Sequence, residues 1–101
     1  MENFTKEKLT KLVLDLLKTH FEENGDHVDL SESEKTKLFG GDGILDSLGL
    51  VSFIVTVEEA LQDELGITLV LADEKAMSRR TSPFAKVSYL VDYIFEVIQE
   101  N

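Results

Sequence analysis

Ser47 is the residue of this chain whose type and position could do chemistry. It follows Asp46 and precedes Leu48 in the stretch GILDSLGL, and an aspartate there is a good N-cap for a helix that begins at the serine. No G-x-S-x-G elbow surrounds Ser47, and no base lies near it in the sequence, so nothing local would activate its hydroxyl. Two interpretations remain open: the pair only starts a helix, or a separate enzyme attaches a group to Ser47.

Other kinds of site find little support. The chain has no cysteine, which excludes disulfides, thiolate metal sites and cysteine nucleophiles. His20 and His27 are its only histidines, and the carboxylates show no ligand spacing, so we expect no metal. Gly40, Gly41 and Gly43 permit tight turns before Asp46 but do not form a phosphate-binding G-x-x-x-x-G-K-[ST] loop. We therefore expect no catalytic residues and no enzymatic activity.

Length and charge limit the function further. At 101 residues the chain is one domain's worth, so we expect a single domain over residues 1–101. With 20 acidic against 10 basic residues the formal net charge is −10, which repels nucleic acid and anionic lipid and attracts basic protein patches. An acidic surface that only keeps the protein in solution would explain the same charge.

The N-terminal stretch is unlike a targeting signal. Acids and lysines are spread through its apolar positions, whereas a signal peptide has a basic start and an unbroken apolar segment. No apolar run approaches the ~20 residues that cross a bilayer. We expect a cytoplasmic monomer without membrane insertion, and a discrete protein rather than a module of a synthase, because a plausible domain fills the chain from Met1.

The elements that would position Ser47 are helices. The first helix carries apolar residues on a 3.6-residue period, capped by Asn3 or Thr5 and stopped by Asn24 and Gly25. Its stripe consists of Leu9, Leu12, Val13, Leu16, Leu17, His20 and Phe21. We interpret His20 as a helix-end residue beside the core rather than a ligand.

A long connection over residues 25–46 leads to the second helix, predicted over residues 47–64 and ended by Gly66. The connection is expected to be pinned by its apolar residues: Val28, Leu30, Leu38, Phe39, Ile44 and Leu45. A β-prone run over 67–71 is too isolated to make a sheet, and residues 72–77 could form one or two helical turns.

Ser82 is the predicted cap of the last helix, with Pro83 at the first helical position. Its apolar face comprises Val87, Leu90, Val91, Ile94 and Ile98. The fold class is therefore all-α: a small four-helix bundle with three main helices, a short third helix, and a long loop between helices one and two.

The second helix has two apolar faces when its residues are placed at about 100° each. The core face consists of Leu50, Phe53, Ile54, Val57 and Leu61. Leu48, Val51 and Val55 point away from it, beside Ser52, Glu59 and Gln62, with Glu58 at the edge. This second face either binds a partner or is covered by the long connection. We favour a partner, since an apolar centre with a charged rim is typical of recognition surfaces.

The combination resembles an acyl carrier protein over nearly the whole chain. It includes a helix, a long glycine-containing loop, Asp46-Ser47-Leu48, an apolar second helix, a short third helix and a final helix. In that family the serine carries 4′-phosphopantetheine, which a separate phosphopantetheinyl transferase takes from coenzyme A. The acyl group is held as a thioester on the terminal thiol. The resemblance implies that Ser47 is the attachment site, that Asp46 and Leu48 are its recognition neighbours, and that the chain is a non-catalytic carrier.

The resemblance also implies partners. These are the phosphopantetheinyl transferase, an acyl-loading ligase or transferase, and downstream synthase enzymes with basic patches. The docking surface would comprise Leu48, Val51, Ser52, Val55, Glu58 and Glu59, with Asp63 and Glu64 adding charge. An adaptor that binds proteins through the second helix without being modified is the alternative function.

Three departures from fatty-acid carriers point to a specialised member. Gly49 and Ser52 stand where many such carriers have acids. The run over 67–87 lacks an I-x-x-E-E pattern and carries Arg79 and Arg80. Because its docking helix is less acidic, we expect a stand-alone carrier for a dedicated acyl, aminoacyl or polyketide pathway rather than the general carrier of fatty-acid synthesis.

Overall fold

The computed structural model describes residues 5–41, 43–66, 68–71 and 82–100. The described chain is all-α, as predicted, with helices α1 (Lys6–Glu23), α2 (Ser47–Leu65) and α4 (Val87–Glu100) and a short 3-10 helix, η1 (Ser33–Lys35). In these ranges no β-strand forms, and only two isolated β-bridges occur. The short helix expected over residues 72–77 lies outside the described residues, as do Asn3, Asp42, Arg79 and Arg80.

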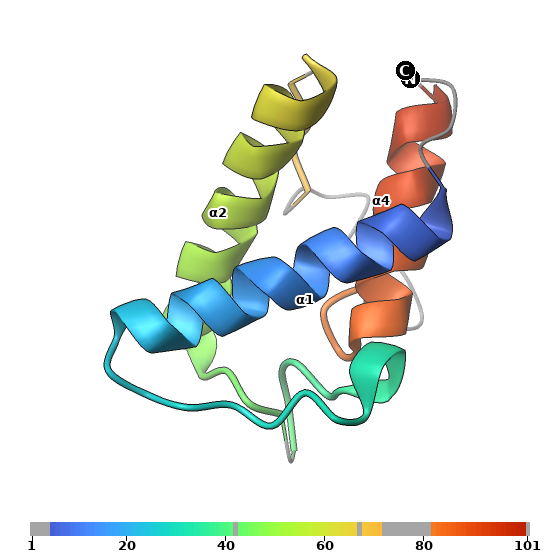
Figure 1. The fold of residues 1–101 in the computed structure, drawn as a ribbon. Helices are drawn as coiled ribbons and strands as arrows, with labels where there is room; N and C mark the ends of the chain where they lie inside the picture. The colour runs from blue at the N-terminus through green and yellow to red at the C-terminus, as the bar shows by residue number, and fades with distance from the viewer. Residues whose placement is uncertain (1–4, 42, 67, 72–81, 101) are drawn as a thin grey trace.

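Helix α1 crosses both α2 and α4 and packs against each of them (Figure 1). Thr5 caps its start, because the Thr5 hydroxyl accepts a hydrogen bond from the Lys8 amide at 3.2 Å. At the other end the Asn24 side-chain amide donates to the His20 carbonyl at 2.8 Å, and Gly25 takes a positive φ of 77°. The predicted stop at Asn24 and Gly25 is confirmed.

The core lies between α1 and the two helices that it packs against. It contains Leu9, Val13 and Leu17 of α1, Phe53, Ile54, Val57 and Leu61 of α2, and Val87, Leu90, Val91, Tyr93 and Ile94 of α4. The predicted core stripes are confirmed in these positions, while Leu50 and Ile98 pack against the core only partly buried. Tyr93 is not part of the apolar face predicted for this helix, but it is fully buried and widens the core face of α4.

The connection between α1 and α2 is held by backbone hydrogen bonds although it has little regular structure. Leu38 donates its amide to the Ala85 carbonyl and accepts at its own carbonyl from the Leu45 amide, both at 2.8 Å. Leu38 and Leu45 are buried as predicted, but Phe39 is 36% exposed, so its expected role in pinning the connection is wrong. Because successive residues of an extended segment face opposite sides, burying Leu38 turns Phe39 outward.

Helix α4 begins later than predicted. The Ser82 hydroxyl accepts a hydrogen bond from the Phe84 amide at 3.1 Å, but residues 83–85 form a turn and a bend instead of a helix. The reason is tertiary: the Val87 amide donates to the Thr36 carbonyl at 3.0 Å, so the chain stays paired with the α1–α2 connection until Val87. Ser82 therefore caps a turn, and the prediction of Pro83 as the first helical residue is wrong.

Candidate functional site

Ser47 is the first residue of α2 and is solvent-exposed. Asp46 is confirmed as the N-cap: it has extended backbone angles, and its Oδ1 accepts a hydrogen bond from the Gly49 amide at 2.7 Å. The first amides of a helix have no intrahelical partner and lie at the positive end of the helix dipole. An anionic group on the Ser47 hydroxyl would therefore lie in a favourable position.

The residues just before Ser47 are fixed by the fold. Leu45 is buried, and its amide donates to the Leu38 carbonyl at 2.8 Å. Gly43 allows this close pairing, because a Cβ there would lie 2.6 Å from the Leu38 carbonyl oxygen and 2.6 Å from the Phe39 nitrogen. A buried anchor thus precedes Ser47 closely, so the serine is exposed while its backbone is held in place.

A second face of α2 is exposed beside Ser47. Leu48, Val51 and Val55 are 82%, 63% and 46% exposed, whereas Phe53 and Val57 on the other side of the same helix are fully buried. The two-face assignment of α2 is thus confirmed, and the described part of the long connection does not cover the second face. Ser52, Glu59 and Gln62 are also exposed. We name Leu48, Val51 and Val55 the outer face of α2.

Glu58 has a structural contact that the sequence did not reveal. Its carboxylate oxygen Oε2 accepts a hydrogen bond from the Leu71 amide at 2.7 Å, and the residue is half-buried. Leu71 is itself fully buried, so Glu58 satisfies a backbone amide that enters the core after α2. The prediction placed Glu58 at the rim of a docking surface; in the structure one of its oxygens is committed to the fold. Nothing in the residue pattern singles out this contact.

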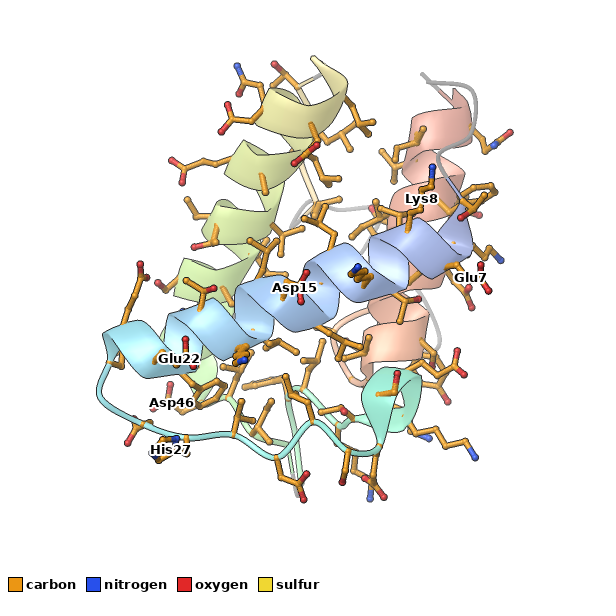
Figure 2. The ribbon with its side chains drawn as sticks, in the orientation of Figure 1. Glu7, Lys8, Asp15, Glu22, His27 and Asp46 are labelled. Atoms are coloured by element: carbon orange, nitrogen blue, oxygen red, sulfur yellow. The ribbon has the colours of Figure 1, made fainter. Side chains whose placement is uncertain are left out.

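A cavity of about 530 Å³ lies beside the start of α2. The C-terminal end of α1, the chain just before α2 and the first turns of α2 line it, and it is partly open to solvent. We name it the α1–α2 cavity; its lining comprises His20, Phe21, Asn24, Asp26, Ile44, Leu45, Asp46, Leu48, Gly49 and Ser52. Figure 2 places Asp46 at the end of the molecule where Glu22 and His27 lie. Two of the residues that line the cavity, Asp26 and Asp46, carry carboxylates.

His20 lies at this cavity in the position predicted for it. Its ring meets Phe21 and Phe53 edge-on, with centroid distances of 5.6 and 5.8 Å, which places the imidazole against the core. Asp46 lines the same cavity, but Ser47 is not among the lining residues. The cavity therefore does not join the serine hydroxyl to the imidazole in the way a nucleophile and its base require.

Among the described residues, no group of three or more His, Cys, Asp or Glu side chains is placed to hold a metal ion. No helix in the described ranges is long and apolar enough to span a bilayer. The chain matches no family model, no curated protein and no solved structure.

Proposed function

We propose that this protein is a carrier of the acyl-carrier type, in which Ser47 holds a 4′-phosphopantetheine arm and partner enzymes act on the acyl, aminoacyl or polyketide group that the arm bears. One observation carries the proposal: Ser47 is exposed at the capped start of α2, directly beside the exposed outer face of that helix. When bound, the arm would supply a thiol for thioester carriage, which the cysteine-free chain lacks.

The residues around Ser47 fit such a group. The Asp46 cap fixes the first turn of α2, so the serine hydroxyl is presented in one place. The free amides of that turn favour the phosphodiester, and the buried Leu45, whose amide donates to the Leu38 carbonyl, anchors the chain just before the turn. No base of this chain is needed for attachment, because the transferase would supply it.

Attachment of phosphopantetheine to Ser47 is a phosphoryl-type transfer. The Ser47 oxygen forms a bond to the phosphorus of coenzyme A that bears the pantetheine, and the pyrophosphate bond breaks. Adenosine 3′,5′-bisphosphate leaves, and the serine proton goes to a base on the transferase. The outer face of α2, Ser52 and Glu59 would then dock partners through apolar and charge contacts, because a net charge of −10 favours basic surfaces.

The carrier function also implies a fourth helix. A carrier of this kind would be a four-helix bundle in which residues 72–77 form a short third helix and the long connection precedes Ser47. Carbon chemical shifts measured by NMR test this directly. Helical shifts over 72–77 support the bundle, and extended or random-coil shifts there contradict it.

Mass spectrometry tests the proposed attachment. The protein is incubated with coenzyme A and a promiscuous phosphopantetheinyl transferase, alongside the Ser47→Ala and Ser88→Ala variants. Ser88 lies on α4 and outside the proposed docking surface, so Ser88→Ala is the control. We expect one phosphopantetheine on the natural chain and on Ser88→Ala, and none on Ser47→Ala. No mass gain on the natural chain, or a gain that survives Ser47→Ala, overturns the proposal.

The exposed outer face of α2 also favours a second candidate, an adaptor that binds a partner through this helix without modification. The two functions differ in their dependence on Ser47. Partner binding by an adaptor should be indifferent to Ser47→Ala and sensitive to Val51→Glu. A carrier loses its cargo with the first change and its docking with the second.

A further inference from the structure

The net charge of −10 is unevenly distributed, and lysines gather where the α1–α2 connection meets the start of α4. Lys37 and Lys86 lie opposite each other in an isolated antiparallel β-bridge. The hydrogen bonds of this bridge, at 2.8 and 3.0 Å, are made by the residues on either side of the two lysines. Lys37 and Lys86 are therefore a non-hydrogen-bonded pair, in which opposite side chains lie closest together and on the same face.

Two aromatic rings accompany the lysines. Phe39 follows Lys37 by two residues and faces the same side of its extended segment. The Lys86 ammonium lies over the Tyr89 ring, 5.5 Å from its centroid. Both rings are partly exposed, and Lys35 adds a positive charge at the end of η1, which packs against α4 (Figure 1). We name Lys35, Lys37, Phe39, Lys86 and Tyr89 the basic patch.

The position of Lys86 is electrostatically unfavourable. Its carbonyl accepts a hydrogen bond from the Leu90 amide at 3.0 Å, so Lys86 holds the N-cap position of α4. The N-terminus of a helix carries partial positive charge and favours acids. Accordingly α1 has Glu7 in its first turn and α2 has Asp46 as its cap, whereas the first turn of α4 contains no acidic residue.

The pairing of Lys86 with Lys37 is unfavourable as well, because like charges directly opposite each other repel. The chain has 20 acidic and 10 basic residues, so an acid at either position would be the commoner outcome. Two electrostatic preferences are thus broken at one exposed place. Such a conflict with local preference is expected at a functional site, where binding rather than stability determines the residue types.

We propose that the basic patch is a docking surface for an acidic segment of a partner protein. Carboxylates of the segment would pair with the lysines, and an apolar side chain among them would lie against Phe39 and Tyr89. Nucleic acid and an anionic membrane fit less well, because these extended polyanions also meet the rest of a chain of net charge −10. The patch shares no residue with the outer face of α2, so the inference is independent of Ser47 and of the carrier function.

An NMR titration of the full chain tests the docking surface. The probe is an end-capped peptide of four glutamates around one phenylalanine, and the control peptide has glutamines in place of the glutamates. We expect chemical-shift changes centred on Lys37, Lys86 and Tyr89 that weaken as salt is added, and none with the control peptide. Equal shifts with both peptides, or shifts centred on the lysines of α1, would overturn the proposal.

Two charge reversals separate the patch from net charge. Lys86→Glu and Lys18→Glu change the net charge equally, and Lys18 is exposed on α1. We expect Lys86→Glu to weaken peptide binding about three- to tenfold, as an exposed ion pair is replaced by a repulsion, and Lys18→Glu to leave it nearly unchanged. Equal weakening in the two variants would mean that only net charge matters, and would contradict the docking surface.

The stability of Lys86→Glu tests the electrostatic argument. The reversal removes the like-charge pair and places an acid at the start of α4, so the variant should unfold at a higher urea concentration than the natural chain. A lower urea midpoint would show that Lys86 serves the fold rather than a partner.

Sedimentation distinguishes the other occupants of the patch. We expect the natural chain to remain a monomer as its concentration is raised, and not to sediment with vesicles that contain phosphatidylserine. Self-association that Lys86→Glu abolishes would identify a second copy of this chain as the occupant. Vesicle binding that Lys86→Glu abolishes would identify an anionic membrane. Either result would overturn the assignment to an acidic protein segment.

Discussion

Two valines of α2 offer a matched test of its two faces. Val57 is fully buried and Val51 is 63% exposed, and both lie within the same helix. We predict that Val57→Ala strongly lowers the free energy of unfolding and that Val51→Ala leaves it nearly unchanged. The substitution is chemically identical at both positions, so the difference reports burial alone.

The magnitudes follow from the exposed fractions. A valine-to-alanine change removes two methyl groups, and at Val57 this costs about 1.6 kcal/mol of transfer free energy at roughly 0.8 kcal/mol per group. The cavity left behind raises the loss to about 2–3 kcal/mol. Val51 has about a third of its surface buried, so it loses roughly 0.6 kcal/mol. Alanine's better helix propensity offsets a similar amount there.

Urea unfolding followed by far-UV circular dichroism measures both variants. Val57→Ala should lower the urea midpoint with an unchanged slope, and should lower Tm by about 10–20 °C for a domain of this size. Val51→Ala should stay within about 0.5 kcal/mol of the natural chain. If the two variants lose stability equally, the outer face of α2 is part of the core and cannot serve as a docking surface.

Three further outcomes test local features of the structure. Asp46→Ala should lower the free energy of unfolding, measured in urea, by about 1 kcal/mol, and Asp46→Asn by only a few tenths, because asparagine caps a helix as well as aspartate does. Equal losses in the two variants would mean that the charge of Asp46, and not its capping hydrogen bond, stabilises α2. Thr36→Val should raise the free energy of unfolding by about 1 kcal/mol, since the buried Thr36 hydroxyl has no hydrogen-bond partner among the residues that the structure describes. A loss of stability would show that the hydroxyl is bonded in solution. The pKa of Asp29, read from an NMR titration, should lie below its ordinary value, because the backbone amide and then the side chain of Ser31 hydrogen-bond its carboxylate. The stability that these bonds add is present above the unfolded pKa of Asp29 and is lost as the pH falls through its folded pKa. An ordinary pKa would contradict the hydrogen bonds.

The sequence predicted the helices well where periodicity and capping agree. The stripe of α1, the Asp46 cap and the Gly66 stop of α2 each have a local physical cause, and each was found at the predicted place. Gly66 adopts a left-handed conformation with φ 70°, as a glycine after a helix often does.

Long-range contacts account for what the sequence could not predict. The start of α4 is shifted to Val87 because residues 85–87 pair with the distant segment around Leu38, a contact that no local pattern encodes. The hydrogen bond that Glu58 accepts from the Leu71 amide could not be predicted either, because it depends on the path of the chain after α2. The sequence alone therefore placed Glu58 at a partner surface. Both errors arise where tertiary hydrogen bonds override a local preference.

Only part of the candidate site could be predicted from the sequence. Ser47, its cap and the outer face of α2 followed from helix geometry, and their exposure agrees with it. The α1–α2 cavity could not be predicted, because residues that follow α1, Asn24 and Asp26, and a residue of α2, Gly49, line it together. Its existence depends on the crossing of two helices, which the spacing of residues along one helix does not determine.

The mass of the protein isolated from the cells that naturally make it tests most directly whether Ser47 is a carrier site. Intact-mass analysis, followed by fragmentation of the peptide around Ser47, should find the chain with phosphopantetheine, alone or bearing an acyl-type group, attached at that serine. The same measurement would identify the cargo. If Ser47 is unmodified in every fraction, or if the modification lies on another residue, the carrier function is wrong and the adaptor function takes its place.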